Sequence, residues 1–273
     1  MTLHRTTRRG DAADLAARLA PLGAGTTLLA VGGDGTMSEV ANGLLRARDG
    51  RPLPRLALLP SGSGNDLARQ LGIPRDPRAL AGLLDQGATR PVDAGRLAWP
   101  GGERWFLNVA SFGFTAAANL LVDRLGKRIG GASYVAGALA AFARHRDHPV
   151  RLGVDGEVAA PLRLGCGVAA NGAWFGSGMH VAPGAAVDDG RLDFVAVGGA
   201  GRLRLAAMLA GVFTGRHLRA RGVTRRAVQA LRVEWDGALP FEADGEPLAV
   251  ASPVEIGVEP AALAVVAPAG GKR

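Results

Sequence analysis

The sequence predicts an α/β plus all-β fold, with a doubly wound parallel-sheet unit over residues 1–90 and a β-sandwich-like unit over residues 91–273. Two short apolar runs near the start are each followed by a glycine-rich turn and a helical pattern, which is typical of parallel strands joined by helices. After residue 90 the sequence changes to many short strand-like runs separated by Gly and Asp-Gly turns, as in an antiparallel sandwich. Trp105–Ala110 is predicted as one of these strands, and a helical pattern is expected from about Ala116 to Arg144. A chain of 273 residues is long enough to bury a core in each unit.

The first strand–turn–helix unit contains the most informative motif of the chain. Leu28–Val31 is an uninterrupted apolar run and predicts a buried strand. The turn Gly32-Gly33-Asp34-Gly35 follows, and Thr36-Met37-Ser38-Glu39 fits a capping box, so we expect the helix to begin at Thr36. A turn at a helix N-terminus favours anions. A carboxylate at such a site repels phosphate unless it binds a metal ion or transfers a proton. Asp34 therefore indicates one of these two roles more than a simple Asx turn.

A second unit of the same construction lies about thirty residues further on. Arg55–Leu59 predicts a strand, Pro60–Gly64 a turn, and Asn65 the start of a helix ending at Leu71. Hydroxyl and amide groups of this turn can bind phosphate oxygens, although the same residues also suit a plain flexible loop. Because carboxyl ends of parallel strands meet at one sheet edge, we expect the two turns to share a crevice. A further helix is predicted over Asp76–Gln86, with Asp76 as its N-cap.

These motifs resemble the diacylglycerol kinase catalytic family, which includes bacterial lipid kinases and the sphingosine and ceramide kinases. Gly32–Thr36 is similar to the nucleotide-binding signature of that family, and NAD kinases and phosphofructokinases carry versions of it. Leu58–Arg69 looks closely like the bacterial diacylglycerol kinase pattern, which NAD kinases lack. Further similar stretches are Asn171-Gly172, Phe175–Met179 and Asp188–Gly190, so the resemblance covers nearly the whole chain. It implies an NAD kinase/phosphofructokinase-like first unit and an active site in the cleft between the two units.

The resemblance also implies the cofactors and the residues of the site. ATP and Mg²⁺ are the expected cofactors, Asp34 and Glu246 the catalytic acids, and Asp34 and Asp189 the metal ligands. The nucleotide-binding residues that it implies are Thr6, Gly32, Gly33, Gly35, Thr36, Glu39, Ser61, Gly62, Ser63 and Asn65. Which of Asp34 and Glu246 accepts the proton of the acceptor hydroxyl stays open.

Asp-Gly-Glu occurs twice in the second unit, and the sequence by itself does not choose between the two copies. Asp155-Gly156-Glu157 has strand-like residues on both sides and predicts a hairpin turn, so we interpret Glu157 as structural. Asp244-Gly245-Glu246 resembles the second signature acid of the family.

The N-terminal segment enters the resemblance at Thr6, before a helical pattern that ends near Pro21. The opening strand of the family and its Asn-Pro/Ser-Gly turn do not occur in this sequence. That strand would lie between a strand near Leu3–Thr6 and the strand Leu28–Val31. We therefore expect the natural chain to begin upstream of Met1.

The net charge of +8 is concentrated in one interval without acidic residues, between Asp193 and Glu234. Its arginines are Arg202, Arg204, Arg216, Arg219, Arg221, Arg225, Arg226 and Arg232. A solvated basic face is one explanation, but interleaved apolar residues such as Leu203, Leu209 and Phe213 favour contact with an anionic membrane surface. The interval has few aromatic residues on which bases could stack, so nucleic acid is not the expected partner.

The predicted function is transfer of the ATP γ-phosphate to the hydroxyl of diacylglycerol or a similar lipid alcohol. The alternatives are an NAD kinase-like enzyme and a catalytically impaired protein that binds lipid or nucleotide. The sequence has no apolar run of ~20 residues and no signal-peptide pattern, and Cys166 is its single cysteine. The expected location is cytoplasmic with peripheral membrane association, and the oligomeric state stays open, with a homodimer as one alternative.

Overall fold

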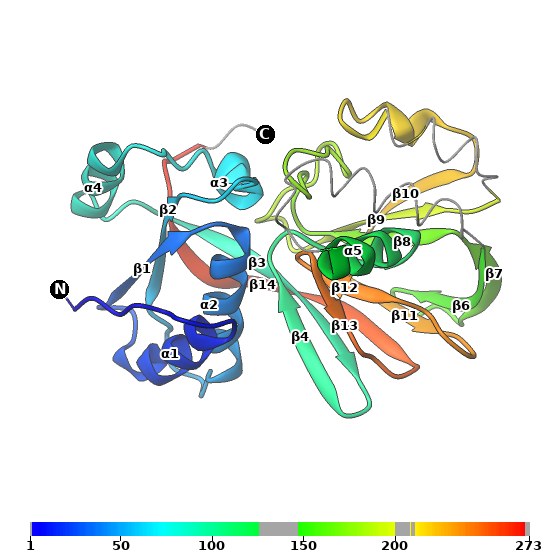
Figure 1. The fold of residues 1–273 in the computed structure, drawn as a ribbon, viewed down its shortest axis with the longest axis horizontal. Helices are drawn as coiled ribbons and strands as arrows, with labels where there is room; N and C mark the ends of the chain where they lie inside the picture. Colours follow the sequence, from blue (N-terminus) through cyan, green and yellow to red (C-terminus); the bar gives the residue numbers. More distant parts are fainter. Residues whose placement is uncertain (1, 126–146, 200–207, 209–210, 271–273) are drawn as a thin grey trace.

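The computed structural model describes residues 2–125, 147–199, 208 and 211–270, and it contains two packed units (Figure 1). The first unit is a mixed sheet with helices, in which β1 and β2 pair in parallel from Thr27↔Arg55 to Gly32↔Pro60. Its elements are α1 (Asp11–Leu19), η1 (Ala20–Leu22), β1 (Thr27–Gly32), α2 (Asp34–Arg46), β2 (Arg55–Pro60), α3 (Asp66–Leu71) and α4 (Pro77–Asp85). The predicted cap of α4 is confirmed, because the Asp76 carboxylate accepts the N–H groups of Arg78 and Ala79.

The second unit is the predicted β-sandwich, in which two sheets enclose an apolar core. Its elements are β3 (Thr89–Trp99), β4 (Gly102–Phe106), β5 (Val109–Gly113), α5 (Phe114–Leu125), β6 (His148–Val154), β7 (Ala160–Leu164), β8 (Cys166–Ala170), β9 (Leu192–Val197), η3 (Arg216–Arg219), β10 (Val223–Val228), β11 (Ala230–Glu234), β12 (Phe241–Ala243), β13 (Glu246–Leu248) and β14 (Val254–Val266). One sheet has the order β10-β9-β8-β5-β12-β13. Its side chains Phe112, Phe194 and Phe241 pack against Leu231 and Ile256 of the other sheet.

The two units share a sheet, because β14 belongs to both. That sheet has the order β1-β2-β14-β11-β6-β7, and β3 pairs with β14 and with β4. The first half of β14 places Val254 and Ile256 in the sandwich core, and its second half places Leu263 and Val265 in the first core. The first core is therefore completed by residues far beyond the predicted boundary at residue 90.

Three expectations about single elements need correction. The strand Leu28–Val31 forms as β1, but it lies at the sheet edge with Leu29 44% and Val31 60% exposed, so it is not a buried strand. The predicted strand near Leu3–Thr6 is absent, since these residues have no regular structure. Trp105–Ala110 is not one strand either, because the chain turns a corner between β4 and β5.

One further prediction extends beyond the described residues. The helical pattern after Ser111 begins as α5, and the remainder of the predicted helix up to Arg144 lies outside the described residues. None of the helices in the described ranges is long and apolar enough to cross a lipid bilayer.

Candidate active site

The two glycine turns lie face to face at the carboxyl ends of β1 and β2, as the sequence predicts. The Ser61 N–H donates to the Gly32 carbonyl oxygen at 2.9 Å and extends the pairing of the strands into the turns. A Cβ on Gly62 would come within 2.6 Å of the Gly33 Cα, so only glycine allows this approach. The Asn65 side chain braces the second turn through its Nδ2, which donates to the Gly62 carbonyl at 2.6 Å. Asn65 thus has a local structural partner beside its predicted ligand role.

The helix after the first turn begins earlier than the capping box predicts. α2 starts at Asp34 with Gly33 as its N-cap, and no side chain caps it. Thr36 is therefore inside the first helical turn, and its Oγ1 lies over Gly32, where a Cβ would be 2.4 Å away. Since no side chain caps this start, the first N–H groups of α2 stay available to an anion.

Asp34 reaches across to the second turn. Its Oδ1 accepts the Leu67 N–H at 3.2 Å, and its Oδ2 lies 2.8 Å from the position that a Gly64 Cβ would occupy. The Asp66 Oδ2 and the Ser177 Oγ face the same point, at 3.5 and 3.4 Å. Two carboxylates and a hydroxyl therefore converge around Gly64, a residue that leaves room for them by having no side chain.

Asp66 is the buried member of this group. Burial raises the pKa of the Asp66 carboxyl and the nearby Asp34 carboxylate adds to the rise, while the Ser177 N–H and Arg69 oppose it. The Arg69 guanidinium pairs with Asp66 and also lies over the Trp174 ring, 5.4 Å from its centre. Trp174 in turn stacks on His180 at 4.0 Å. A rigid aromatic and cationic layer thus supports Asp66 on the sandwich side.

The turn that carries Glu246 joins β12 to β13 and is anchored by Asp244. The Asp244 carboxylate accepts the N–H groups of Leu107, Asn108 and Val109 at 2.9, 2.9 and 3.1 Å. These amides form the corner between β4 and β5, which explains why the predicted single strand is interrupted there. Burial raises the pKa of Asp244, and the three amides oppose that shift.

Glu246 is bound by arginines from both units. The Arg104 Nη2 lies 2.5 Å from its Oε2, and the Arg9 Nη2 lies 3.0 Å from its Oε1. Arg104 comes from β4 of the sandwich, whereas Arg9 precedes α1 of the first unit. Both carboxylate oxygens are therefore engaged by cations, and Glu246 lies where the two units meet.

Helix α2 connects the Asp34 group with the Glu246 turn. Asn42 of α2 exchanges two hydrogen bonds with the backbone of Trp105, at 2.9 and 3.0 Å, next to Arg104. Ser38 of α2 faces Asp244. Because residues four apart share a helix face, Asp34 lies on the side of α2 that contacts this turn. The structure thus brings both predicted catalytic acids to one side of α2.

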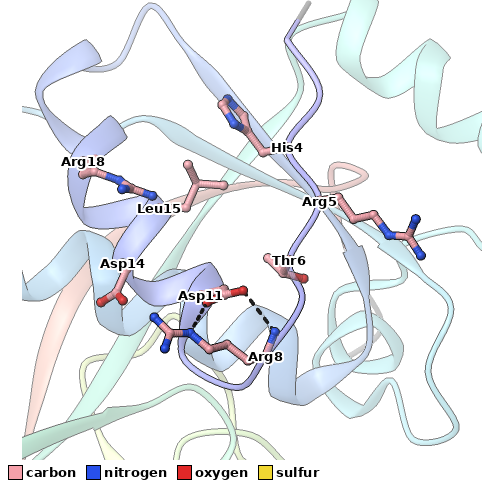
Figure 2. Close-up of a pocket in the computed structure, with 8 residues that line it drawn as sticks. All are labelled: His4, Arg5, Thr6, Arg8, Asp11, Asp14, Leu15 and Arg18. Atoms are coloured by element: carbon pink, nitrogen blue, oxygen red, sulfur yellow. Dashed lines mark hydrogen bonds and ion pairs between the residues drawn. The ribbon is translucent and has the colours of Figure 1, made fainter.

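Other predicted residues lie apart from this group. Thr6 lines an open pocket of about 300 Å³ between the N-terminal segment and α1, where Asp11 accepts the N–H groups of Thr7 and Arg8 (Figure 2). The described contacts link neither Thr6 nor Glu39 to the two turns. Asp189 accepts the Arg191 N–H at 3.0 Å in a tight turn, and its neighbour Asp188 pairs with Arg90. The ligand role of Asp189 stays a prediction.

The other Asp-Gly-Glu copy has the structure expected of a turn. Asp155–Glu157 follows β6 in the hairpin with β7, and exposed Glu157 pairs with Arg226 at 2.8 Å. That bond and the positive charge of Arg226 lower the pKa of Glu157.

Several residues of the site escaped the sequence reasoning. Three of them, Asp66, Ser177 and Asp244, lie inside stretches that resemble the family. Their place next to the predicted site residues could have identified them from the sequence. Arg9 and Arg104 gave no such signal, because their contact with Glu246 joins residues 237 and 142 positions apart.

The donor set suits a nucleotide phosphate with Mg²⁺ better than a metal bound by protein alone. Within the described residues no three His, Cys, Asp or Glu side chains gather as a metal site. Mg²⁺ commonly takes one or two carboxylates and completes its shell with phosphate oxygens and water. Asp34 and Asp66 beside the glycine turns fit that pattern.

Comparison with known proteins decides the family. Residues 1–97 match the diacylglycerol kinase catalytic domain, and residues 108–267 match the YegS C-terminal NAD kinase beta sandwich-like domain. The chain is also 34% identical over 268 residues to a diacylglycerol kinase of Mycobacterium tuberculosis, covering 96% of this chain and 84% of that protein. This chain belongs to the diacylglycerol kinase catalytic family.

Two further proteins are similar to this chain, one in sequence and one in fold. A protein named probable lipid kinase YegS-like from Pseudomonas aeruginosa is 38% identical over 256 residues, covering 89% of this chain and 77% of the other. A solved structure of a diacylglycerol kinase from Bacillus anthracis shares the fold, with a TM-score of 0.69 at 20% identity over 96% of this chain and 83% of the other. The two glycine turns that resemble the family motifs are the ones that face each other in this structure, with Gly33 opposite Gly62.

Proposed function

We propose that this protein is an ATP-dependent lipid kinase that phosphorylates the hydroxyl of diacylglycerol or a similar lipid alcohol. The observation that carries the proposal is the close approach of the Gly33 and Gly62 turns, with Asp34 and Asp66 facing each other around Gly64. Backbone amides at two apposed glycine turns suit the phosphates of a nucleotide. The carboxylates beside them suit the metal that accompanies those phosphates.

The residues of the site divide the work of phosphoryl transfer. When bound, Mg²⁺ would neutralise charge on the transferred phosphoryl group, with Asp34 as its carboxylate ligand. The N-terminus of α2 and the second turn would hold the nucleotide phosphates. Asp34 or Glu246 would accept the proton of the attacking lipid hydroxyl. If Glu246 accepts the proton, it has to release Arg9 or Arg104 before one of its oxygens can contact the lipid hydroxyl.

The test is transfer of labelled phosphate from ATP into a panel of acceptors. The panel contains diacylglycerol, ceramide, sphingosine and NAD, each with and without Mg²⁺, and Asp34→Asn serves as the inactive control. Label in diacylglycerol or another lipid alcohol, dependent on Asp34, supports the proposal. Label in NAD alone would establish the NAD kinase alternative, and ATP binding without transfer to any acceptor would indicate a catalytically impaired binding protein.

A membrane-facing surface belongs to the same proposal, because the acceptor is a lipid. Three arginines of the basic interval already have acidic partners within the protein. Arg225 pairs with Asp193, Arg226 with Glu157 and Arg232 with Glu234. Arg202 and Arg204 lie outside the described residues. In the part of the chain that the structure describes, no ion pair involves the exposed residues Arg216, Arg219 and Arg221. Phe213, 56% exposed, precedes them. These four residues suit an anionic lipid surface, in which Phe213 inserts and the arginines meet lipid phosphates.

Vesicle binding of two matched triple variants tests this surface. Replacing Arg216, Arg219 and Arg221 by Gln should weaken binding to vesicles containing phosphatidylglycerol by about 100-fold at low salt, at ~1 kcal/mol per charge near the surface. The control replaces Arg225, Arg226 and Arg232 by Gln, which removes the same charge from existing ion pairs. Equal losses in both variants would show that net charge alone, not this surface, governs binding.

A further inference from the structure

We infer that Glu242 is a positioning residue for Glu246, because it anchors the Asp244–Glu246 turn from the buried side. The inference rests on the proposed function, in which Glu246 belongs to the catalytic site. It concerns a side chain that no motif singles out and that has no access to substrate, since Glu242 is 0% exposed.

Glu242 occupies the middle of β12, opposite Ser111 of β5 and Pro247 of β13. Its neighbours Phe241 and Ala243 face the sandwich core. Since side chains alternate along a strand, Glu242 points to the other face of the sheet, which α5 covers. An apolar side chain is the ordinary occupant of such a position. A carboxyl group there has to be supported by fixed hydrogen-bond partners.

Both oxygens of Glu242 have such partners. Its Oε2 accepts the Gly245 N–H at 2.7 Å, and its Oε1 accepts the Ser111 hydroxyl. The Thr115 hydroxyl on α5 donates to the Ser111 Oγ at 2.9 Å and fixes that end of the chain of bonds. The contact toward the catalytic turn is therefore made by a side chain that is itself held rigidly.

The turn needs an anchor because its backbone is unfavourable for a side chain. Asp244 and Gly245 both have left-handed backbone angles, with φ of 48° and 81°. The Asp244 carboxylate fixes the turn to the corner at residues 107–109. Glu242 fixes the next peptide through the Gly245 N–H, and Glu246 follows directly. Two clamps on consecutive residues thus set the direction in which the Glu246 side chain leaves the backbone.

The hydrogen bond to Gly245 does not depend on the charge of Glu242. Burial raises the pKa of the Glu242 carboxyl to about 8, so the neutral acid predominates at neutral pH. A glutamine has the same shape and can accept the Gly245 N–H through Oε1 while its Nε2 faces Ser111. A leucine of similar volume can make neither contact. This pair of substitutions separates hydrogen bonding from space filling.

The experiment compares Glu242→Gln, Glu242→Leu and Ser111→Ala in the full chain. Ser111→Ala is the matched control, because it removes the other hydrogen bond of the same carboxyl group and leaves the Gly245 contact. We expect Glu242→Leu to lower kcat about 10- to 100-fold with the KM for ATP within about 2-fold. Glu242→Gln and Ser111→Ala should keep kcat within about 3-fold. Hydrogen exchange of the Gly245 amide should quicken in Glu242→Leu only.

Each other result would overturn the inference. Unchanged kcat in Glu242→Leu would show that the turn needs no anchor, and a Glu242→Gln variant as slow as Glu242→Leu would show that the charge matters instead. Parallel losses of kcat and ATP affinity would indicate a general structural defect. The Gly245 exchange rate needs no activity, so it tests the anchor even if the wild-type protein phosphorylates no lipid and the proposed function fails.

Discussion

Asp34 connects two turns that are separated by about thirty residues of sequence. Its carboxylate accepts the Leu67 N–H of α3 instead of capping α2, the helix in which it stands. It shares the space around Gly64 with Asp66, whose pKa is raised partly by the Asp34 charge. Two carboxylates this close favour a cation between them, because its charge relieves their repulsion.

Replacing Asp34 by Asn should lower turnover by ~10² or more and leave the melting temperature within a few degrees, since an amide keeps the hydrogen bond to Leu67 but loses the charge. Glu246→Gln should behave alike. Steady-state kinetics beside thermal melting measure both effects. Glu157→Gln is the control, because exposed Glu157 pairs with exposed Arg226 away from both turns and the variant should stay fully active. An active Asp34→Asn variant would remove Asp34 from the mechanism.

Glu242 predicts a pH dependence of stability. The pKa of its carboxyl group is about 8 in the folded state and 4.5 for the free group. Between pH 4.5 and pH 8 the folded state therefore keeps a proton that the unfolded state has released. Stability should therefore fall as the pH rises from about 5 to 8, by up to ~1.4 kcal/mol per unit. Glu242→Gln should remove this contribution and melt higher than the wild type at pH 8, with little difference at pH 5. Identical pH profiles of melting temperature would contradict the burial of a neutral acid.

At the scale of elements, the strand–turn–helix units were predictable and their contacts were not. The ends of β2, α3 and α4 could be predicted because Gly, Pro and Asp residues at these ends act as local turn and cap signals. The capping box at Thr36 did not mark the helix start, since α2 already begins at Asp34 with Gly33 as its N-cap. The break between β4 and β5 depends on Asp244, more than 130 residues away. No local pattern contains that information.

Replacing glycine by alanine should impair the enzyme in the two glycine turns and leave it active in helix α4. Gly64→Ala should lower kcat strongly, because its Cβ would lie 2.8 Å from the Asp34 Oδ2, and Gly62→Ala should weaken ATP binding, because its Cβ would press on the Gly33 backbone. Gly82→Ala in α4 meets no atom within 4 Å and should be fully active and up to ~1 kcal/mol more stable. Kinetics and thermal melting of the three variants test this. A Gly64→Ala variant with normal kcat would show that the carboxylates do not converge there during catalysis.

At the scale of the whole molecule, the fold class was predictable and the sharing of β14 was not. The sequence predicts two short strands near its end, Val254–Val258 and Leu263–Val266, and neither run has a feature that distinguishes an edge of the sandwich from a bridge between two cores. The register shift between Glu259 and Leu263 marks the crossing point, where the Ala261 N–H donates to Asp93 at 2.7 Å. The bend lets one strand pair with β11 at one end and β2 at the other.

This sharing predicts that the two units unfold together. Leu263, 2% exposed, packs in the first core on the strand that also enters the sandwich. Leu263→Ala should cost about 2–5 kcal/mol and lower the melting of both units by the same amount. Calorimetry should show one transition for wild type and variant, and hydrogen exchange in β8 should quicken together with that in β1. Two separate transitions, with only the first shifted, would contradict the shared sheet.

The position of β14 also has a consequence for synthesis. During translation, domains generally fold as they emerge, starting from the N-terminus. Here β1, β2 and the helices around them leave the ribosome nearly two hundred residues before the strand that completes their core. The core around Leu56 and Leu58 therefore stays incomplete until Leu263 and Val265 have been synthesised, so the first unit assembles long after its own strands and helices are made.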